Sequence, residues 1–240
     1  TSEYIDYLAA NIHLERPVRF AADGGNATAG LAAPELFTRL GCDPVLLYME
    51  PDGSFPNHHP DPTVAKNLVD LRKKVLDEGL ELGIGFDGDS DRIGVVDEKG
   101  DIIWGDTLLA IYARDVLESN PGAAVICEVK CSKALPEEIE RLGGRPIMWK
   151  TGHSLIKQKM RDEGAPLAGE MSGHQFFADR YFGFDDAIYA ACRILEIVSK
   201  SKKTLSEMLA DYPKYESTPE IRVECPDEKK FDVVRRVADH

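Results

Sequence analysis

Three absences in the sequence exclude whole classes of protein. No apolar run is long enough to cross a bilayer, so we expect no membrane-spanning helix and no membrane partner. The first residues, TSEYIDYLAANIHLERP, lack the basic and apolar segments of a secretory signal. Basic residues are scarce, because 29 Lys and Arg stand against 42 Asp and Glu, for a net charge of −13. Since sequence-blind nucleic-acid binding needs a positive field, we expect no nucleic-acid partner.

Cysteine is also sparse, and the spacing of the cysteines suggests no disulfide framework. The chain has five cysteines, an odd number at irregular spacings. Cys127 and Cys131 lie four residues apart, but no second Cys or His pair completes a zinc site. A chain of 240 residues needs no disulfide staples to fold. We therefore expect a reducing compartment, the cytoplasm.

What the sequence does contain is an alternation of predicted strands and helices. Strands are predicted over 18–23, 44–49, 80–86, 93–97, 101–104, 123–129, 145–150, 166–172, 174–179 and 217–225. The helices between them include 64–78, stopped by Gly79, and one beginning near 105 with Asp106 as its N-cap. No internal repeat is obvious. This order predicts an α/β fold with mixed, largely parallel sheets.

The alternation falls into two sets and an incomplete third. We expect one α/β domain over residues 1–101, a related one over 102–213, and the start of a further unit over 214–240. The last predicted helix runs to the final residue. A domain boundary inside a helix is unusual, so the interpretation is that the chain is a piece of a longer protein.

An acidic loop follows the strand LGIGF. In FDGDSDRIG, Asp87, Asp89 and Asp91 occupy alternate positions, separated only by small residues. A coiled backbone lets their carboxylates converge, and three hard oxygens suit Mg²⁺. Arg92 follows directly and is placed to hold a phosphate beside the metal. The loop predicts a magnesium site next to an anion.

Two other interpretations of the acidic loop stay open. One is an Asp-rich turn without a ligand, since Asp is common in turns. The other is an EF-hand, because Glu98 falls at the twelfth position counted from Asp87. Against the EF-hand, Arg92 stands where a sharp turn needs Gly, and the flanking segments read as strands rather than helices.

Three further loops carry polar groups suited to a sugar phosphate. In GEMSGH, alternation on an extended segment would place Glu170, Ser172 and His174 on one side, between glycines that let a ligand approach; a polar strand edge is the alternative. His153 in KTGHS and Lys130 in EVKCSK each follow a predicted strand, where α/β sheets bind ligands. A solvated loop is the alternative for these two.

Other polar pairs are expected to be structural. His58 and His59 lie in a Pro-rich loop, where adjacent side chains point apart, so a turn is predicted rather than a shared metal. Asp185 and Asp186 precede a predicted helix and are expected to cap it.

Taken in order, DGDSDR, KTGH and GEMSGH resemble the α-D-phosphohexomutases, and most closely the bacterial phosphomannomutase/phosphoglucomutase branch. PNHHPDP, GRPIMWKTGHSLIKQKM and FGFDDAIYAA add to the resemblance, which covers essentially the whole chain. The resemblance implies that Asp87, Asp89 and Asp91 are the Mg²⁺ ligands and that Arg92 lies beside the phosphoryl group. It also implies that Lys130 and His153 lie near the sugar phosphate. Glu170, Ser172 and His174 would bind the sugar hydroxyls.

The resemblance also implies a reaction. Such enzymes have four domains, and a phosphoserine exchanges its phosphoryl group with mannose or glucose 1- or 6-phosphate through a hexose 1,6-bisphosphate. The Thr-Ala-Ser-His-Asn-Pro-type loop that carries the serine, and the Ser-Gly-Thr-type loop of the fourth domain, are absent here. We therefore expect the second and third domains with the beginning of the fourth, and no turnover by this chain alone.

Two other functions are weighed against the mutase. A metal-dependent sugar-phosphate hydrolase would need a nucleophile such as Asp87. A non-catalytic sugar-phosphate-binding module would use the scaffold without chemistry. The sequence does not distinguish mannose from glucose phosphate, and it carries no sign of an oligomeric state.

Overall fold

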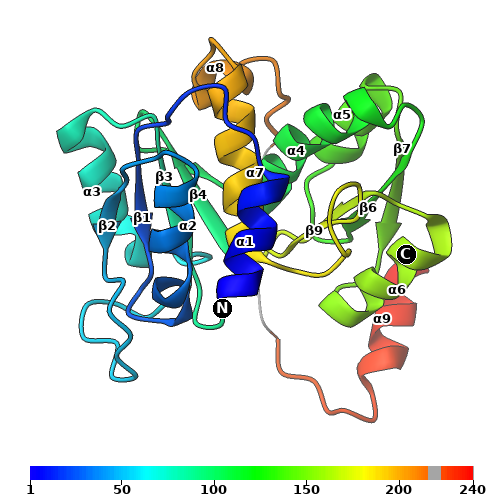
Figure 1. The fold of residues 1–240 in the computed structure, drawn as a ribbon. Helices are drawn as coiled ribbons and strands as arrows, with labels where there is room; N and C mark the ends of the chain where they lie inside the picture. Colours follow the sequence, from blue (N-terminus) through cyan, green and yellow to red (C-terminus); the bar gives the residue numbers. More distant parts are fainter. Residues whose placement is uncertain (216–222, 240) are drawn as a thin grey trace.

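The computed structural model describes residues 1–215 and 223–239, and they contain two β-sheets flanked by helices (Figure 1). The first sheet has the order β2-β1-β3-β4-β5, with β1 Phe20–Asp23, β2 Val45–Leu47, β3 Leu82–Phe86, β4 Ile93–Asp97 and β5 Ile102–Ile103. The second has the order β7-β6-β8-β9, with β6 Ala124–Glu128, β7 Arg145–Trp149, β8 Leu167–Gly169 and β9 Gln175–Phe177. The predicted α/β fold with mixed, largely parallel sheets is confirmed.

The two sheets repeat one topology that the sequence does not reveal. In each, the first strand pairs in parallel with the second and third strands of its unit, and the third pairs antiparallel with the fourth. The β3–β4 hairpin therefore corresponds to the β8–β9 hairpin. These two hairpins carry the acidic loop and the GEMSGH loop, so the two predicted site loops are the same connection in two related units.

The helices fill the connections between strands. They are α1 (Ser2–Asn11), α2 (Ala33–Arg39), α3 (Val69–Glu78), α4 (Gly105–Ser119), α5 (Ala134–Arg141), α6 (His153–Glu163), α7 (Ala187–Lys200), α8 (Leu205–Met208) and α9 (Lys230–Ala238), with short 3₁₀ turns η1 (Thr28–Leu31) and η2 (Ala65–Leu68). None of these described helices combines the length and apolarity that a bilayer crossing requires. The strand predicted over 217–225 falls mostly outside the described residues.

Two predictions about helix ends have opposite outcomes. Gly79 ends α3 in the left-handed conformation, with φ of 58°, as predicted. Asp106 is not the N-cap of α4, because the helix already begins at Gly105 after Trp104. The Asp106 carboxylate instead accepts a hydrogen bond from the Ser132 amide (2.8 Å), so it ties α4 to the loop after β6.

One hydrophobic core joins the two units. The inner face of each sheet packs against helices α1, α2, α4, α5 and α7, and Figure 1 shows α1 and α7 running between the sheets. The outer faces form separate small cores, which α3 covers on the first sheet and α6 on the second. Strands buried on both faces read as continuous apolar runs, which explains why LGIGF and AVIC were recognisable in the sequence.

A buried cation lies within the shared core. Arg193 on α7 is 1% exposed, and its guanidinium donates to Asp179 (2.9 Å) and to Asp115 on α4 (2.8 Å). It also lies over the ring of Phe177, 4.6 Å from the centroid. Removing a charge from water is costly unless partners replace the water, and these contacts supply them.

His58 is structural, as predicted, and it closes the 51–62 loop onto the first sheet. Its Nε2 lies 3.0 Å from Oδ2 of Asp23, a buried carboxylate at the end of β1. Its Nδ1 lies 3.0 Å from the His59 carbonyl oxygen. The bond to Asp23 outweighs partial burial and raises the pKa of His58 to about 9. The imidazole is therefore cationic at neutral pH.

This contact predicts a pH-dependent stability. Because the pKa of His58 is raised above its unfolded value of about 6.5, its stabilisation is complete below that pH and is lost as pH rises through about 9. The loss should be on the order of 2 kcal/mol. Urea unfolding at pH 6 and pH 10 should show a smaller change for His58→Gln than for the parent chain. Equal changes in the two proteins would contradict the assignment.

Candidate active site

The acidic loop and the GEMSGH loop meet at the ends of their hairpins. The Ile93 amide donates a hydrogen bond to the Gly173 carbonyl oxygen (3.1 Å), and Arg92 and His174 form an antiparallel bridge. Gly173 has a φ of 98°, and a Cβ there would lie 2.6 Å from the Ile93 oxygen. Only glycine permits this approach, so the two loops are joined through their backbones.

The three aspartates of the acidic loop converge. Asp87, Asp89 and Asp91 each offer a carboxylate oxygen, and these oxygens lie within 4.8 Å of one another. Ser90 between them adopts a left-handed φ of 65°, which curls the loop, and its hydroxyl bonds Thr28 (2.9 Å). The loop joins the antiparallel strands β3 and β4, so the EF-hand interpretation, which needs flanking helices, is wrong.

Asp87 is held more tightly than its neighbours. Its Oδ1 accepts hydrogen bonds from the Asp91 and Arg92 amides (both 3.0 Å), and its Oδ2 accepts one from Arg92 Nε (2.7 Å). The side chain is buried, and burial raises the pKa of Asp87. These contacts organise the loop and speak against Asp87 as a free nucleophile. Arg92 is partly exposed and also approaches Asp61 (3.5 Å).

Glu170, Ser172 and His174 come together, although for a different reason from the predicted one. The segment is a tight turn rather than an extended strand, and the turn itself brings the groups together. His174 Nδ1 lies 2.9 Å from Glu170 Oε2 and 3.0 Å from the Ser172 hydroxyl. Glu170 is 2% exposed, and its Oε1 accepts a hydrogen bond from the Gly152 amide (2.7 Å).

His174 links the two loops through its side chain as well. Its Nε2 lies 3.3 Å from Asp91 Oδ1, opposite the contact with Glu170. Burial opposes the charged form, but the hydrogen bonds to Asp91 and Glu170 outweigh it and raise the pKa of His174 to about 9. An imidazolium therefore lies between the acidic loop and the sugar-loop candidates at neutral pH.

His153 and Lys130 occupy the neighbouring loops. The His153 ring stacks on that of His174 with centroids 6.0 Å apart, and its Nδ1 lies 3.4 Å from Asp185 Oδ2. Its side chain is 55% exposed, so it is accessible to a ligand. Lys130 is half-exposed after β6, with Nζ 3.3 Å from the buried carboxylate of Glu128.

Comparison of the sequence with protein families identifies the family of this chain. The protein-family model described as phosphoglucomutase/phosphomannomutase, alpha/beta/alpha domain II, matches residues 2–100. The family model for alpha/beta/alpha domain III matches residues 104–215. The chain belongs to the phosphoglucomutase/phosphomannomutase family.

Individual relatives agree. A Pseudomonas aeruginosa phosphomannomutase/phosphoglucomutase is 49% identical over 96% of this chain and 50% of the relative, and a Neisseria meningitidis phosphoglucomutase is 47% identical over 95% and 49%. A crystal structure of a phosphoglucomutase/phosphomannomutase family protein from Burkholderia thailandensis has a TM-score of 0.87 at 48% identity, covering 91% of this chain and 47% of that one. The chain thus spans about half the length of the relatives it matches.

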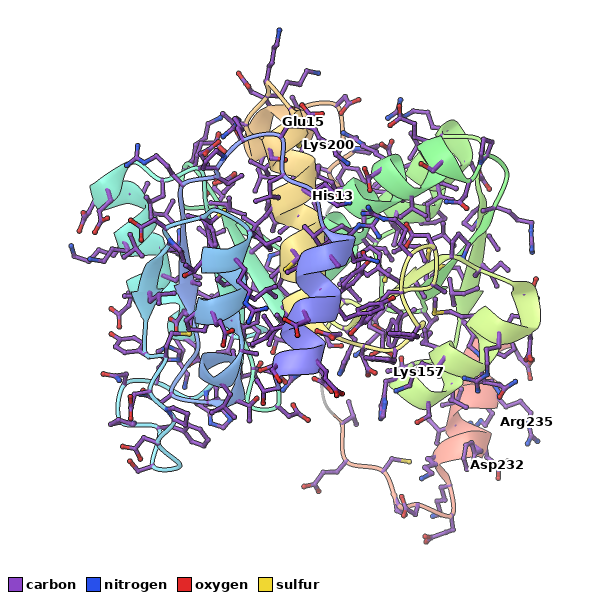
Figure 2. All side chains as sticks on the ribbon, in the orientation of Figure 1. His13, Glu15, Lys157, Lys200, Asp232 and Arg235 are labelled. Atoms are coloured by element: carbon purple, nitrogen blue, oxygen red, sulfur yellow. The ribbon has the colours of Figure 1, made fainter. Side chains whose placement is uncertain are left out.

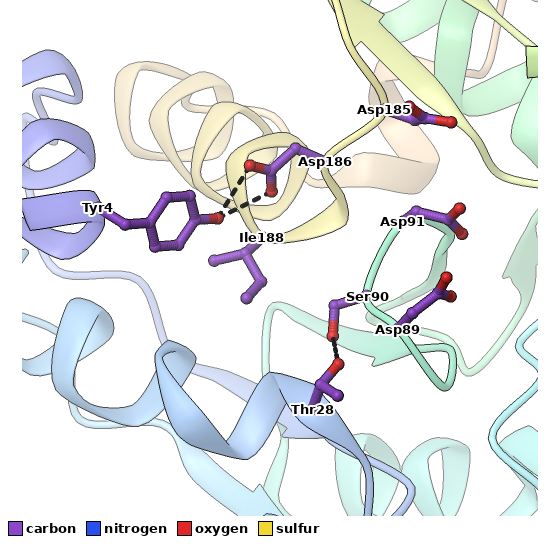
Figure 3. Close-up of a pocket in the computed structure, with 8 residues that line it drawn as sticks. All are labelled: Tyr4, Thr28, Asp89, Ser90, Asp91, Asp185, Asp186 and Ile188. Atoms are coloured by element: carbon purple, nitrogen blue, oxygen red, sulfur yellow. Dashed lines mark hydrogen bonds between the residues drawn. The ribbon is translucent and has the colours of Figure 1, made fainter. Parts of the chain in front are cut away.

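In this family member the acidic loop opens onto a cleft of about 260 Å³ (Figure 3). The side chains lining it are Tyr4, Thr28, Asp89, Ser90, Asp91, Asp185, Asp186 and Ile188. Asp186 caps α7 as predicted, accepting a hydrogen bond from the Tyr189 amide, and it also bonds Tyr4 (2.9 Å). Asp185 is not a cap, because it turns toward the cleft and pairs with Lys157 (2.8 Å).

Sequence reasoning missed three residues that contact the candidate site residues of this family member. Asp185 was expected to be a cap, and neither Lys157 nor Glu128 was selected. Lys157 lies one helical turn after His153, a spacing that could have suggested a contact. Glu128 ends the apolar strand AVICE, and a charge at the end of a buried strand was the available signal.

Proposed function

We propose that the protein to which this chain belongs transfers a phosphoryl group between positions 1 and 6 of glucose or mannose phosphates in a Mg²⁺-dependent reaction. One observation carries the proposal: the contact between Asp91 and His174 joins a carboxylate cluster to a polar sugar-loop candidate. Phosphoryl transfer depends mainly on positioning and on stabilisation of charge, and the cleft offers groups for both.

The donor set fits Mg²⁺. Three carboxylate oxygens, with no sulfur or nitrogen among them, are the hard ligands that this cation prefers. Asp87, Asp89 and Asp91 would hold the ion, and a bound Mg²⁺ would neutralise negative charge on the phosphoryl group. Arg92 keeps Asp87 oriented, and its side chain stays partly exposed beside the acidic loop. The oxygen-only set supports the metal proposal.

The second loop supplies groups for the sugar. Ser172 can donate to a hydroxyl, Glu170 retains acceptor capacity, and His174 can give or hold a proton at Nε2. Lys130 and His153 are exposed enough to meet a phosphate. In an acidic protein, these few local cations would hold the anionic substrate against the net charge of −13.

The remaining parts of the proposal concern the longer protein. No serine loop of the Thr-Ala-Ser-His-Asn-Pro type occurs in this sequence, so the phosphoserine and hexose 1,6-bisphosphate steps would need residues outside it. We propose domains over 1–101, 102–213 and 214–240, no turnover by this chain alone, and a cytoplasmic location. The residue ranges of the two family models support the domains over 1–101 and 102–213. The five free thiols support a cytoplasmic location.

The test is a ³¹P NMR assay of a full-length protein carrying this chain. With Mg²⁺ and glucose 1,6-bisphosphate, glucose 1-phosphate should convert to glucose 6-phosphate, and chelation of the metal should stop the conversion. The 240-residue chain should show no turnover. Release of free phosphate as the main product would favour the hydrolase. A folded full-length protein inert on glucose, mannose and glucosamine phosphates would refute the mutase.

A further inference from the structure

Glu128 ends β6 as the one charged residue of that strand. Its side chain is 0% exposed and lies at the carboxyl end of β6, the end of the second sheet from which the candidate sugar loops extend. A buried carboxylate is tolerated only where donors satisfy its oxygens, because it has lost its water. The donors around Glu128 therefore show what the burial of this charge achieves.

Those donors come from three separate loops. The Thr151 hydroxyl donates to Oε1 (2.6 Å), and the Met171 amide donates to Oε2 (3.0 Å). Lys130 Nζ lies 3.3 Å from Oε1. One side chain thus contacts the turn before α6, the GEMSGH loop and the loop after β6. These loops carry His153, Glu170 with His174, and Lys130.

A second carboxylate reinforces the same connection from the opposite side. Glu170 in the GEMSGH loop accepts a hydrogen bond from the Gly152 amide, next to Thr151. The two loops are therefore cross-linked twice, once through Glu128 and once through Glu170. Because charge-assisted hydrogen bonds are stronger than neutral ones, this arrangement holds both turns in one geometry.

The first unit uses a comparable device. Asp23 at the end of β1 is buried and binds His58, in the loop that follows β2. Glu128 at the end of β6 binds Thr151, in the loop that follows β7. In each repeated unit, a carboxylate at the end of the first strand fixes the loop after the next strand. The contact of Asp23 with His58 is an observation separate from the contacts of Glu128.

We propose that Glu128 is a positioning residue: its buried carboxylate holds the 150–152 turn, the 170–174 loop and Lys130 in the arrangement that receives a hexose phosphate. The inference rests on the proposed function for its ligand, but the loop arrangement itself is a property of this chain. Glu128 touches no reacting atom. It acts through Thr151, Met171 and Lys130.

Glu128→Gln tests the proposal with little change in size. Thr151 and Met171 donate to different oxygens of Glu128, and the carboxamide keeps only one acceptor oxygen, so it cannot satisfy both donors in this geometry. In the isotope-labelled 240-residue chain, the Met171 amide should exchange with solvent at least about tenfold faster, as expected when a hydrogen bond to a charged group is lost. The dissociation constant for glucose 1-phosphate, from NMR shifts, should rise by a similar factor.

Two controls separate positioning from general destabilisation. Glu138 on α5 is also buried (1% exposed) and pairs with Arg114 (2.6 Å) and Arg141 (2.7 Å) away from these loops. Glu138→Gln, compared at equal folded fraction, should leave Met171 exchange and glucose 1-phosphate binding unchanged. Thr151→Val should weaken binding, whereas Thr151→Ser, which keeps the hydroxyl, should restore it.

The outcomes are distinguishable from those of the proposed function. Unchanged Met171 exchange in Glu128→Gln, or equal effects of Glu138→Gln, would overturn the positioning role. If the parent chain bound no glucose 1-phosphate, that ligand would be wrong, but the exchange rates would still decide whether Glu128 holds the loops. Faster amide exchange that includes Met171 and is confined to residues 150–152 and 170–174 would support the role in either case.

Discussion

Replacing Asp89 with Asn should raise the dissociation constant for Mn²⁺ at least about tenfold, the loss that even outer partners of a metal ligand produce. Asp89 is the exposed member of the three-carboxylate cluster, and it makes no hydrogen bond within the described part of the chain. The substitution therefore removes a ligand charge without removing an internal contact. Paramagnetic broadening of the amides of residues 87–92 during a Mn²⁺ titration measures the affinity.

The matched control for this experiment is Asp43→Asn. Asp43 is also exposed and acidic, but it precedes β2, away from the acidic loop. Both variants change the net charge equally, so a general electrostatic effect would appear in both. The metal assignment predicts a loss of affinity in Asp89→Asn alone. Equal Mn²⁺ affinity in Asp89→Asn and the parent chain would leave the loop as an ordinary Asp-rich turn.

Arg193→Met should lower the free energy of unfolding by about 3–5 kcal/mol, the range for breaking a buried ion pair from one side. The methionine can fill much of the volume, but it leaves Asp179 and Asp115 without their cation. The side chain of Asp179 is 8% exposed, so little water replaces the lost cation, and the other nearby cation, Arg180, lies 4.0 Å away. Urea unfolding followed by circular dichroism measures the loss.

Lys200→Met on the same helix provides the comparison. Lys200 is 41% exposed, and its Nζ lies 3.8 Å from the buried carboxylate of Glu196, which Arg180 also pairs with, so losing this long contact should cost less than about 1 kcal/mol. The two substitutions remove one positive charge each from α7 and differ mainly in burial. A loss for Arg193→Met as small as that for Lys200→Met would mean that its partners find other donors, and that this cluster does not stabilise the shared core.

The sequence was sufficient for the features that local chemistry determines. The apolar run before Asp87 predicted a buried strand, the spacing of Asp87, Asp89 and Asp91 predicted their convergence, and Gly79 marked the end of α3. Each of these depends on residues within a few positions of one another. The glycines around 169–174 were expected to let a ligand approach the backbone, but at Gly173 the backbone of Ile93 makes the close approach instead.

The features that the sequence did not predict depend on distant contacts. Nothing near Arg92 indicates that it will bridge to His174, about eighty residues away along the chain, because strand pairing at long range leaves no local pattern. Asp185 was interpreted as a cap because capping is the commonest local role of Asp before a helix. Its orientation toward Lys157 on α6 (Figure 2) depends on a contact between that helix and the segment that precedes α7, which only the fold specifies.

The repeated hairpin has a consequence for how such a site changes over time. Under the proposed function the two copies divide the work, with the cation ligands in the β3–β4 copy and the groups for sugar hydroxyls in the β8–β9 copy. Each loop is shaped by its own pair of strands. Gly173 and His174 contact the acidic loop, so under the proposed function a change at either position would affect the sugar and the cation ligands together. Ser172 bonds only within its own loop among the described residues, so it is the position where sugar preference could change while the cation ligands stay in place.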